Sequence, residues 1–561
     1  MKRFTWMLLL LAACQSQPAK MDPETWAQQT LAGLTLERKA AQLVSTEISG
    51  QYIADDDPRL AQWISLAETH GIGGFVVYGG TPHSCASLLN KLQSHAQIPI
   101  LMSTDFEGGA GQQITGATEF PANMAFAATG DDDLMYRAAK IMAEEGRAMG
   151  FHLSYTPVSD ISLSPDNPQE SGRSFGGDLD LLSKMLNAYV KGYHEMGMLT
   201  TAKHFPGRGD MKGGPAYPSF TAIHKDAAAL DTLEFRAFKL AIDAGVDFMM
   251  TEHIAVPAIT GTDMPASVEP KLSRGIIRGK LGFKGILTSD DLWYDHVIAR
   301  FGKEDVAVKA MEAGHDIVLK PKDPVATIAA IVEAVKSGRI RQTQLDSSVL
   351  KLLVKKASLG LHVNSQVDLN KISSVVGTAA HAAVLREVAD RSVTALRNNG
   401  GLQQPLEPAT TVHLIIQKDD NQPNAVQLVK EMTAAFPGMQ HLVLRPRLSA
   451  AYRDEVRKSA LGARRVVVSL LVQRDRHGDP APLRAEDVSL LNELIRAKKE
   501  NLVAMSFGNP HLLRRIPEIN ALLVGYGEGG FYGNQPVYFN SWIRILKGEL
   551  TPNGVLPIRL Q

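Results

Sequence analysis

The chain lacks several features that would assign it to particular classes of protein. Its 561 residues contain only two cysteines, and its 59 basic side chains balance its 59 acidic ones. Without a net charge, neither nucleic acid nor an acidic membrane surface is an expected partner. The sequence has no zinc-ligand spacing of Cys and His, no Walker loop and no isolated dinucleotide fingerprint. We therefore expect no bound metal and no cofactor, and nothing in the sequence points to an obligate protein partner.

The N-terminal apolar run is too short to cross a membrane. It covers residues 4–11, whereas a spanning helix needs about 20 residues. Its length and its basic start are typical of a signal peptide. The run ends in Leu11-Ala12-Ala13-Cys14, which resembles a bacterial lipobox, and a polar tether follows at residues 15–19. A plain secretory signal with an incidental cysteine is the alternative, but the tether favours a lipoprotein signal over residues 1–14.

This signal predicts where the protein resides. Cys14 becomes the acylated first residue of the mature chain, so we expect a lipid-anchored protein of the bacterial cell envelope that faces the periplasm or the exterior. With Cys14 acylated, only Cys85 remains, which excludes an intramolecular disulfide in the mature chain.

The length predicts more than one domain. A chain of 561 residues is too long for a single core, and its 44% apolar and 21% charged residues are ordinary for a soluble globular protein. Short apolar runs alternate with amphipathic stretches over the first two thirds of the chain. Strands are predicted at residues 41–45, 74–78, 100–104, 155–158, 199–202, 248–251, 285–288 and 316–319. Helices are predicted between them at residues 132–149, 181–196, 232–244 and 303–313, among others.

Eight strands that alternate with helices predict a (β/α)₈ barrel of the TIM type. An open doubly wound sheet fits the same periodicity. The barrel is favoured because polar side chains stand at or just past the carboxyl ends of the strands, where barrel enzymes carry their catalytic groups. These side chains are Asp105, Asp160, His204, Glu252, His253 and Asp290.

A second, smaller domain is predicted after the barrel. A helix predicted at residues 378–398 ends at Asn399-Gly400-Gly401, which is typical of a C-cap and a linker. Further strands are predicted at residues 412–416, 465–472, 502–506 and 521–526, with helices at 425–436 and 485–498. These patterns indicate an α/β sandwich with a partly parallel sheet. The expected boundaries are 22–365 for the barrel, 366–400 for a helical linker and 401–561 for the C-terminal domain.

The most informative segment is Lys203-His204-Phe205-Pro206-Gly207-Arg208-Gly209-Asp210. It continues the predicted strand 199–202, which brings Lys203 and His204 to the rim of the barrel. A cation beside an imidazole suits a polyhydroxylated or anionic ligand. The octet resembles the signature of glycoside hydrolase family 3, in particular its β-N-acetylglucosaminidase (β-hexosaminidase) branch.

Three further motifs resemble the same family. They are Asp105-Phe106-Glu107-Gly108-Gly109, Gly172-Arg173-Ser174-Phe175-Gly176 and Thr288-Ser289-Asp290-Asp291-Leu292. The resemblance implies that Asp290 is the catalytic nucleophile and that Asp105, Arg173, Lys203 and His204 bind the substrate. Such side chains suit sugar hydroxyls, because charge-assisted hydrogen bonds are strong and Arg presents a rigid fork of donors.

The carboxylates themselves favour a glycosidase. Retaining glycosidases need one carboxylate to attack the anomeric carbon and a second group to protonate the leaving oxygen. Asp290 is the first carboxylate past the seventh predicted strand and is placed for that attack. Lys203 alone would also fit the Schiff-base lysine of an aldolase-like barrel, but Asp105 and Asp290 favour the glycosidase. We expect Asp291 to cap the following helix, Asp160 to be structural and Glu107 to have no direct role.

The chain departs from the family pattern where the proton donor is expected. In the hexosaminidases the octet continues into a loop with an Asp-x-His acid/base dyad, and residues 211–218 here contain neither member. Arg208 stands where those enzymes often carry His, and Glu252 stands where they carry a small residue. Candidates for the missing acid are Asp210 on the altered loop, Glu252 at a strand end and the charged loop at residues 474–479.

These observations predict an exported, retaining glycoside hydrolase that resembles exo-β-N-acetylglucosaminidases. Its expected substrates are peptidoglycan fragments or chitin-type oligosaccharides, from which it would remove nonreducing-end sugars. Two alternatives stay open. One is another β-glycosidase of the same family, such as a β-glucosidase. The other is a catalytically weak, sugar-binding envelope lipoprotein.

Overall fold

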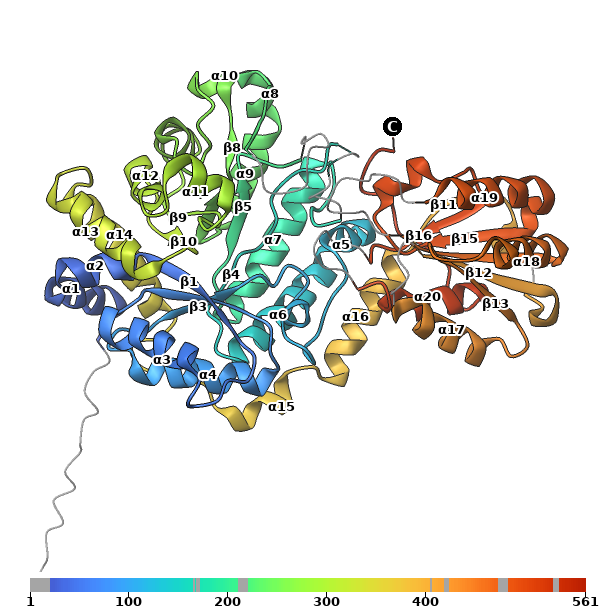
Figure 1. Ribbon diagram of the computed structural model, residues 1–561, viewed down its shortest axis with the longest axis horizontal. Coiled ribbons are helices and arrows are strands. Elements are labelled where there is room, and N and C mark those ends of the chain that lie inside the picture. The colour runs from blue at the N-terminus through green and yellow to red at the C-terminus, as the bar shows by residue number, and fades with distance from the viewer. Residues whose placement is uncertain are drawn as a thin grey trace, which may run out of the picture.

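The computed structural model describes residues 21–164, 167, 172–209, 220–403, 406–417, 423–472, 483–527 and 534–560. The predicted signal peptide, Cys14 and the loops at 211–218 and 474–479 lie outside these residues. None of the helices in the described ranges combines the length and the apolar character that a bilayer crossing requires. The chain forms a helix-covered barrel that is followed by a separate α/β domain (Figure 1).

Eight parallel strands close into a barrel. They are β1 Val44–Ser49, β2 Gly74–Tyr78, β3 Leu101–Thr104, β4 Leu153–Ser154, β5 Thr201–Phe205, β7 Phe248–Thr251, β9 Ile286–Ser289 and β10 Val318–Leu319. One sheet has the order β10-β1-β2-β3-β4 and the other β5-β7-β9. Parallel bridges join the two sheets at both edges, between Leu153 and Leu199 and between Thr288 and Ile317. This closure confirms the predicted barrel over the open sheet.

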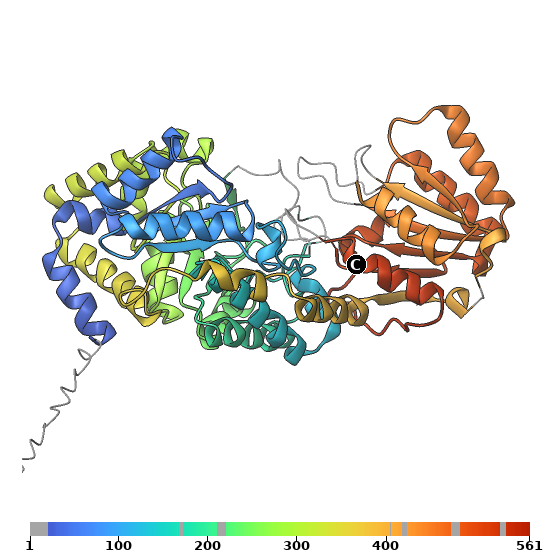
Figure 2. The same cartoon turned by 90° about the horizontal axis from the view of Figure 1, so that it is seen from below.

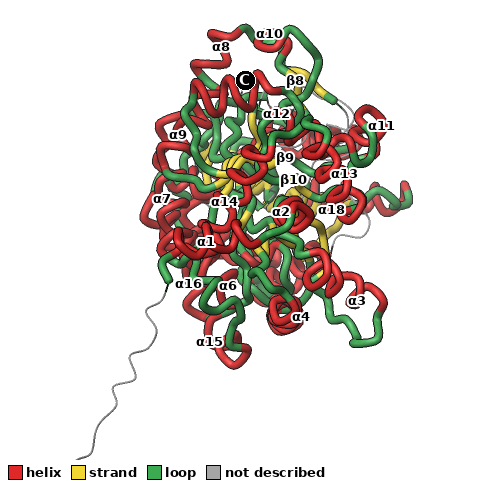
Figure 3. Tube along the Cα trace, turned by 90° about the vertical axis from the view of Figure 1, so that its left-hand side faces the viewer, coloured by secondary structure: helices red, strands yellow, loops and turns green. Residues whose placement is uncertain are grey.

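Helices cover the outside of the barrel, as Figure 3 shows. They are α1 Pro23–Gly33, α2 Leu36–Gln42, α3 Pro58–Ser65, α4 Pro82–His95, α5 Asn123–Thr129, α6 Asp132–Ala148, α7 Leu179–Glu195, α8 Ala227–Thr232, α9 Glu234–Ala244, α10 Pro257–Thr260, α11 Asp295–Phe301, α12 Asp305–Ala313, α13 Pro324–Lys336 and α14 Gln342–Ser358. The short strands β6 Thr221–Ala222 and β8 Ile254–Ala255 pair outside the barrel. Strands β3, β5, β7 and β9 are buried along their whole length, as expected for parallel strands that helices cover.

The second domain is a six-stranded sheet with helices around it. Its strands are β11 Thr394–Asn398, β12 Thr411–Gln417, β13 Gln440–Leu444, β14 Arg465–Leu471, β15 Leu502–Ser506 and β16 Ala521–Val524, in the order β11-β16-β15-β14-β12-β13. Its helices are α17 Pro423–Ala435, α18 Ala450–Gly462, α19 Ala485–Lys498 and α20 Val537–Leu546. Only the β11–β16 pair among these strands is antiparallel, so the predicted partly parallel sheet is confirmed.

The predicted helix at residues 378–398 is wrong over its last six residues. The segment between the domains contains α15 Ile372–Val375 and α16 Ala379–Ser392, and the chain then continues as β11. The β-branched pair Val393 and Thr394 favours extended backbone. The Thr394 hydroxyl is also buried against the hydroxyl of Tyr526, 2.7 Å away. The chain therefore enters the second domain through a strand of its sheet.

The two domains lie side by side and contact each other directly (Figure 2). The N–H of Ala122 donates to the carbonyl of Tyr526 at 3.3 Å, and the N–H of Val555 donates to the carbonyl of Ala128 at 2.8 Å. A buried hydrogen bond of 2.8 Å joins Ser162 Oγ to His511 Nε2. The C-terminal domain thus packs against α5 and the loop that follows β4.

Candidate active site

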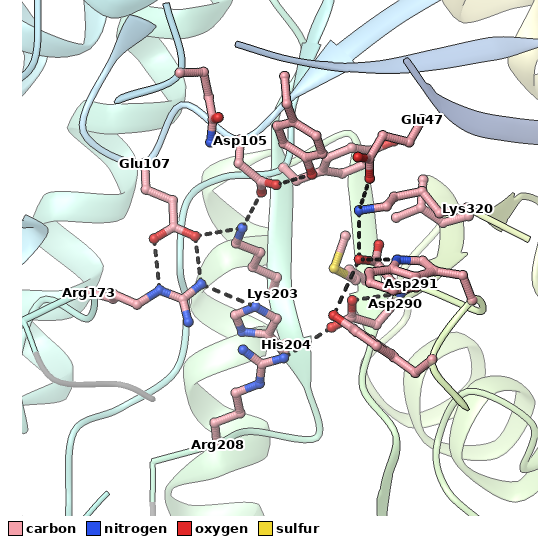
Figure 4. Close-up of a pocket in the computed structure, with 17 residues that line it drawn as sticks. Glu47, Asp105, Glu107, Arg173, Lys203, His204, Arg208, Asp290, Asp291 and Lys320 are labelled. Atoms are coloured by element: carbon pink, nitrogen blue, oxygen red, sulfur yellow. Dashed lines mark hydrogen bonds and ion pairs between the residues drawn. The ribbon is translucent and has the colours of Figure 1, made fainter. Parts of the chain in front are cut away.

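A cavity of about 360 Å³ opens at the carboxyl ends of the barrel strands. Each of the eight strands, or the residue directly after it, contributes to its wall. Figure 4 shows the lining side chains as sticks. The lining residues include Glu47, Tyr78, Asp105, Glu107, Tyr155, Arg173, Lys203, His204, Arg208, Met250, Asp290, Asp291, Leu319 and Lys320. The structure thus brings together all five residues that the sequence assigned to nucleophile and substrate binding.

Arg173, Glu107 and Lys203 form a buried ion-pair network in one wall. Arg173 donates from Nε to Oε2 of Glu107 at 2.8 Å and from Nη2 to Oε1 at 2.6 Å. Lys203 Nζ lies 2.7 Å from the same Oε1. Burial alone would raise the pKa of Glu107, but the charges of Arg173 and Lys203 hold it well below its ordinary value. Glu107 therefore stays ionised and orients both cations, a role that the sequence analysis did not assign to it.

Asp105 lies beside this network, and each of its carboxylate oxygens accepts a hydrogen bond. Its Oδ1 accepts from Lys203 Nζ at 2.7 Å and its Oδ2 accepts from the Tyr78 hydroxyl at 2.6 Å. Burial opposes the charge of Lys203, but Asp105 and Glu107 raise the pKa of Lys203 above its ordinary value. The lysine is therefore a permanent cation, which does not suit the Schiff-base alternative.

Asp160 holds His204 from behind the pocket. His204 Nδ1 lies 2.7 Å from Oδ2 of Asp160, and the backbone N–H of His204 donates to the same oxygen at 3.1 Å. Burial, helped by the charges of Arg208 and Arg173, lowers the pKa of His204 well below its ordinary value. A neutral imidazole that donates from Nδ1 leaves Nε2 as an acceptor, and Nε2 faces Arg173 Nη2 at 3.5 Å.

Asp290 stands at the end of β9 with a donor on each carboxylate oxygen. Oδ1 accepts from the N–H of Asp291 at 2.7 Å, and Oδ2 accepts from Arg208 Nη2 at 3.1 Å. The same Arg208 nitrogen forms an ion pair with Oε2 of Glu252, at the end of β7. This pairing stabilises the ionised form of Glu252, so the geometry does not favour Glu252 as the proton donor. Asp210 lies outside the described residues.

The expected capping role of Asp291 is wrong. Helix α11 begins at Asp295 with Tyr294 as its N-cap, so Asp291 is too far upstream to cap it. Its carboxylate instead lines the cavity and lies 2.8 Å from Lys320 Nζ. Burial and the neighbouring Asp290 raise the pKa of Asp291 to about 6, against the opposing charge of Lys320. This carboxyl group therefore exchanges its proton close to neutral pH, as general acids and bases do.

Lys320 is a cation of the cavity wall that was not among the site residues predicted from the sequence. It follows β10 directly, bridges Asp291 to Glu47 at 2.8 and 2.7 Å, and is buried. Its position just past an apolar strand was the available signal, since Asp290 was found by the same rule.

No group of three or more His, Cys, Asp or Glu side chains in the described ranges is arranged to hold a metal ion.

Comparison with known proteins identifies the family. Residues 35–354 match the model of the glycosyl hydrolase family 3 N terminal domain, which is more than half of the chain. The chain belongs to glycoside hydrolase family 3. It is therefore a glycoside hydrolase, and the resemblance of its motifs to this family is confirmed.

Relatives and solved structures extend the similarity over both domains. A β-N-acetylglucosaminidase/β-glucosidase of Cellulomonas fimi is 27% identical over 562 residues, which cover 96% of this chain and 97% of that protein. β-Hexosaminidase A of Pseudoalteromonas piscicida is 28% identical over 393 residues, 64% of each chain. The structure of a family 3 β-N-acetylglucosaminidase from Paenibacillus sp. str. FPU-7 covers 94% of this chain and 99% of its own with a TM-score of 0.80 at 27% identity. A β-glucoside phosphorylase has the same fold, with a TM-score of 0.81 at 22% identity over 96% of both chains.

Proposed function

We propose that the protein is an exported, retaining, exo-acting β-N-acetylglucosaminidase that removes nonreducing-end sugars from peptidoglycan fragments or chitin-type oligosaccharides. The observation that carries the proposal is the convergence of Asp290, Asp105, Arg173, Lys203 and His204 on one cavity. The cavity volume of about 360 Å³ is near the lower end of ligand sites, which supports recognition of a terminal unit. The names of the relatives from Cellulomonas fimi and Pseudoalteromonas piscicida support the N-acetylglucosamine specificity.

In the proposed reaction the Asp290 carboxylate attacks the anomeric carbon while the glycosidic C–O bond breaks, and the leaving oxygen departs with a proton from a general acid. Water then attacks the covalent glycosyl-enzyme, which releases the sugar and restores the Asp290 carboxylate. The hydrogen bonds to both of its oxygens fix the orientation of the attacking group. Asp105, Lys203 and Arg173 supply charged acceptors and donors for sugar hydroxyls, and the neutral His204 supplies an acceptor nitrogen. Water is favoured over an anion such as phosphate as the acceptor of the sugar. The reason is that the five carboxylates in the cavity wall outnumber its four Lys or Arg side chains.

A panel of activated aryl β-glycosides tests the proposal. The N-acetylglucosaminide, glucoside and xyloside are compared, because an activated leaving group needs little help from an acid. Preferred turnover of the N-acetylglucosaminide with a β-configured sugar product supports the proposal, and an inverted product contradicts the retaining mechanism. Preferred turnover of the glucoside favours the β-glucosidase alternative, which the double name of the Cellulomonas fimi relative also supports. Inertness toward all three favours a sugar-binding lipoprotein, and sugar phosphate formed in phosphate buffer would indicate phosphorolysis.

Export and anchoring form a separate part of the proposal. They rest on the lipobox at Leu11-Ala12-Ala13-Cys14. Changing Cys14→Ser should release the protein into a soluble fraction or leave its precursor uncleaved. Mass spectrometry of the native protein should show an acylated Cys14 at the N-terminus, and an unmodified N-terminus at another residue would contradict the anchor.

A further inference from the structure

One arginine of the active site lies between two buried carboxylates. Arg208 comes from the loop after β5, whereas Glu252 and Asp290 come from the ends of β7 and β9. All three side chains are buried, with relative exposures of 3%, 4% and 6%. A single nitrogen of Arg208, Nη2, contacts Oε2 of Glu252 and Oδ2 of Asp290. The two carboxylate oxygens are therefore separated by no more than two hydrogen-bond lengths.

The backbone holds Arg208 rigidly in this position. Its N–H donates to Oδ1 of Asp160 at 2.8 Å, and its carbonyl accepts from Asn167 Nδ2 at 2.5 Å. The next residue, Gly209, packs so closely on Ile161 that a Cβ there would lie 1.5 Å from the Ile161 carbonyl oxygen. Asp160 also holds His204, so one buried carboxylate fixes both the end of β5 and the backbone of the loop that follows it.

Glu252 is held as firmly as the arginine. Its Oε1 accepts from the N–H of His253 at 2.7 Å, and its own N–H donates to the carbonyl of Phe205 at 2.8 Å. The carboxylate therefore has a fixed direction toward Arg208. Both positions carry residues that depart from the pattern of the resembled hexosaminidases, and the structure shows that these two residues contact each other.

The charges of the three groups depend on one another, and Asp291 and His253 are the further titratable groups that interact with Asp290. Two buried carboxylates this close together would compete for one proton, and one of them would be neutral near neutral pH. A guanidinium between them supplies a permanent positive charge that both carboxylates contact, because Arg does not lose its proton in proteins. Removing Glu252 instead would leave the cation to act on Asp290 alone and would withdraw charge from the attacking carboxylate.

We propose that Arg208 is a positioning residue that keeps Asp290 ionised and oriented, and that Glu252 is the counter-charge that Arg208 requires. The proposal rests on the proposed function in one respect, namely that Asp290 attacks the sugar. Arg208 acts through Asp290 in this scheme, so its loss should change the ionisation of the nucleophile as well as the rate. A purely structural role would change stability without moving the pH profile.

The test compares Arg208→Met, Glu252→Gln, the double variant and Arg208→Lys as a charge-conserving control. The readout is the pH dependence of covalent labelling by an activated fluoro glycoside of the preferred sugar, followed by intact mass. Arg208→Met should label about 10²–10³-fold more slowly at neutral pH, the loss typical for one aligned donor, and its acidic limb should move to higher pH by at least about one unit. The double variant should be labelled at least about tenfold faster than Arg208→Met, because the competing carboxylate is gone. Its acidic limb should return to the pH of the parent enzyme. Arg208→Lys should keep the limb of the parent enzyme.

Two results would overturn the proposal. One is an unchanged acidic limb in Arg208→Met, and the other is a double variant no faster than Arg208→Met. Thermal unfolding provides a second test that needs no substrate. Arg208→Met should be destabilised more at neutral than at mildly acidic pH, since a group with a raised folded pKa loses its stability contribution as the pH rises, and adding Glu252→Gln should restore stability. If the parent enzyme is not labelled but Arg208→Met shows this pH-dependent loss of stability and its rescue, the proposed function fails and the charge coupling stands. If adding Glu252→Gln to Arg208→Met lowers stability further, the charge coupling fails.

Discussion

Replacing Glu107 by glutamine should destabilise the barrel and weaken substrate binding together. The carboxylate accepts two bonds from Arg173 and lies 2.7 Å from Lys203, and relative exposures of 5% and 3% keep both cations away from water. Glutamine keeps the shape but removes the charge, so the two cations are left facing each other. Breaking a buried ion pair costs about 3–5 kcal/mol, and we expect about 3 kcal/mol because Asp105 still compensates Lys203. This corresponds to a loss of about 4 °C in Tm for a barrel of this size, because the entropy of unfolding is about 2.1 cal/mol/K per residue.

The pH dependence gives the sign of this effect. The pKa of Glu107 is depressed in the folded protein, so its contribution to stability is present above its ordinary pKa and is lost as the pH falls. The difference between the parent protein and Glu107→Gln should therefore be largest near neutral pH and should shrink in acid. Denaturant unfolding followed by tryptophan fluorescence suits the measurement, because Trp26, Trp63 and Trp293 lie in the barrel.

The exposed Glu68 provides a matched control for the same chemical change. Glu68→Gln should alter the free energy of unfolding by no more than about 0.5 kcal/mol. A parallel titration with substrate should show a raised KM for Glu107→Gln, because Arg173 and Lys203 lose their common anchor. Unfolding within about 1 kcal/mol of the parent protein, or an equal loss at neutral and acidic pH, would refute the network described above.

Three further predictions concern the core and the ionisation of buried groups. Phe205→Ala should cost about 3–5 kcal/mol in denaturant unfolding, because the ring stacks on Phe235 with centroids 5.4 Å apart and is fully buried. Burial lowers the pKa of Lys356 to about 7, so the unfolded state binds its proton more readily above that pH. The free energy of unfolding should therefore rise by about 2 kcal/mol over the two pH units above neutrality, and Lys356→Met should lose this rise in a denaturation series. Asp291→Asn should remove an ionisation near pH 6 from the profile of kcat/KM, and an unchanged profile would show that this carboxyl does not titrate in the reaction.

The barrel could be predicted from the sequence because its strands are apolar, short and evenly separated by helices. The limits of individual strands were less predictable. The fourth strand was expected at residues 155–158, but β4 is Leu153–Ser154, and beyond it Val158 forms an isolated bridge to Lys203. Pro157 lacks an N–H and cannot extend a continuous ladder. Strand β13 was not predicted at all, since an edge strand pairs on one side only and carries a less regular apolar pattern.

The members of the site could be predicted one by one, but their pairing could not. The rule that polar residues follow barrel strands located Asp105, Lys203 and Asp290. It gave no reason to pair Glu107 with Arg173, because these residues are 66 positions apart and meet only when the barrel closes. The position of Asp291 in the cavity wall was missed because an Asp before a predicted helix is favoured as a cap.

The density of ion pairs in the pocket is consistent with a neutral ligand. Each Lys or Arg in the wall has a carboxylate within bonding distance, as Lys203 has Asp105 and Lys320 has Asp291. A pocket of paired charges exerts little attraction on a distant charge, so recognition depends on the directions of the donors and acceptors that the pairs fix. Sugar hydroxyls both donate and accept, and therefore they match a wall in which charged donors and charged acceptors alternate. In such a wall every substitution that removes one charge also releases its partner, which is why the ion pairs of this site are expected to act as units rather than as single residues.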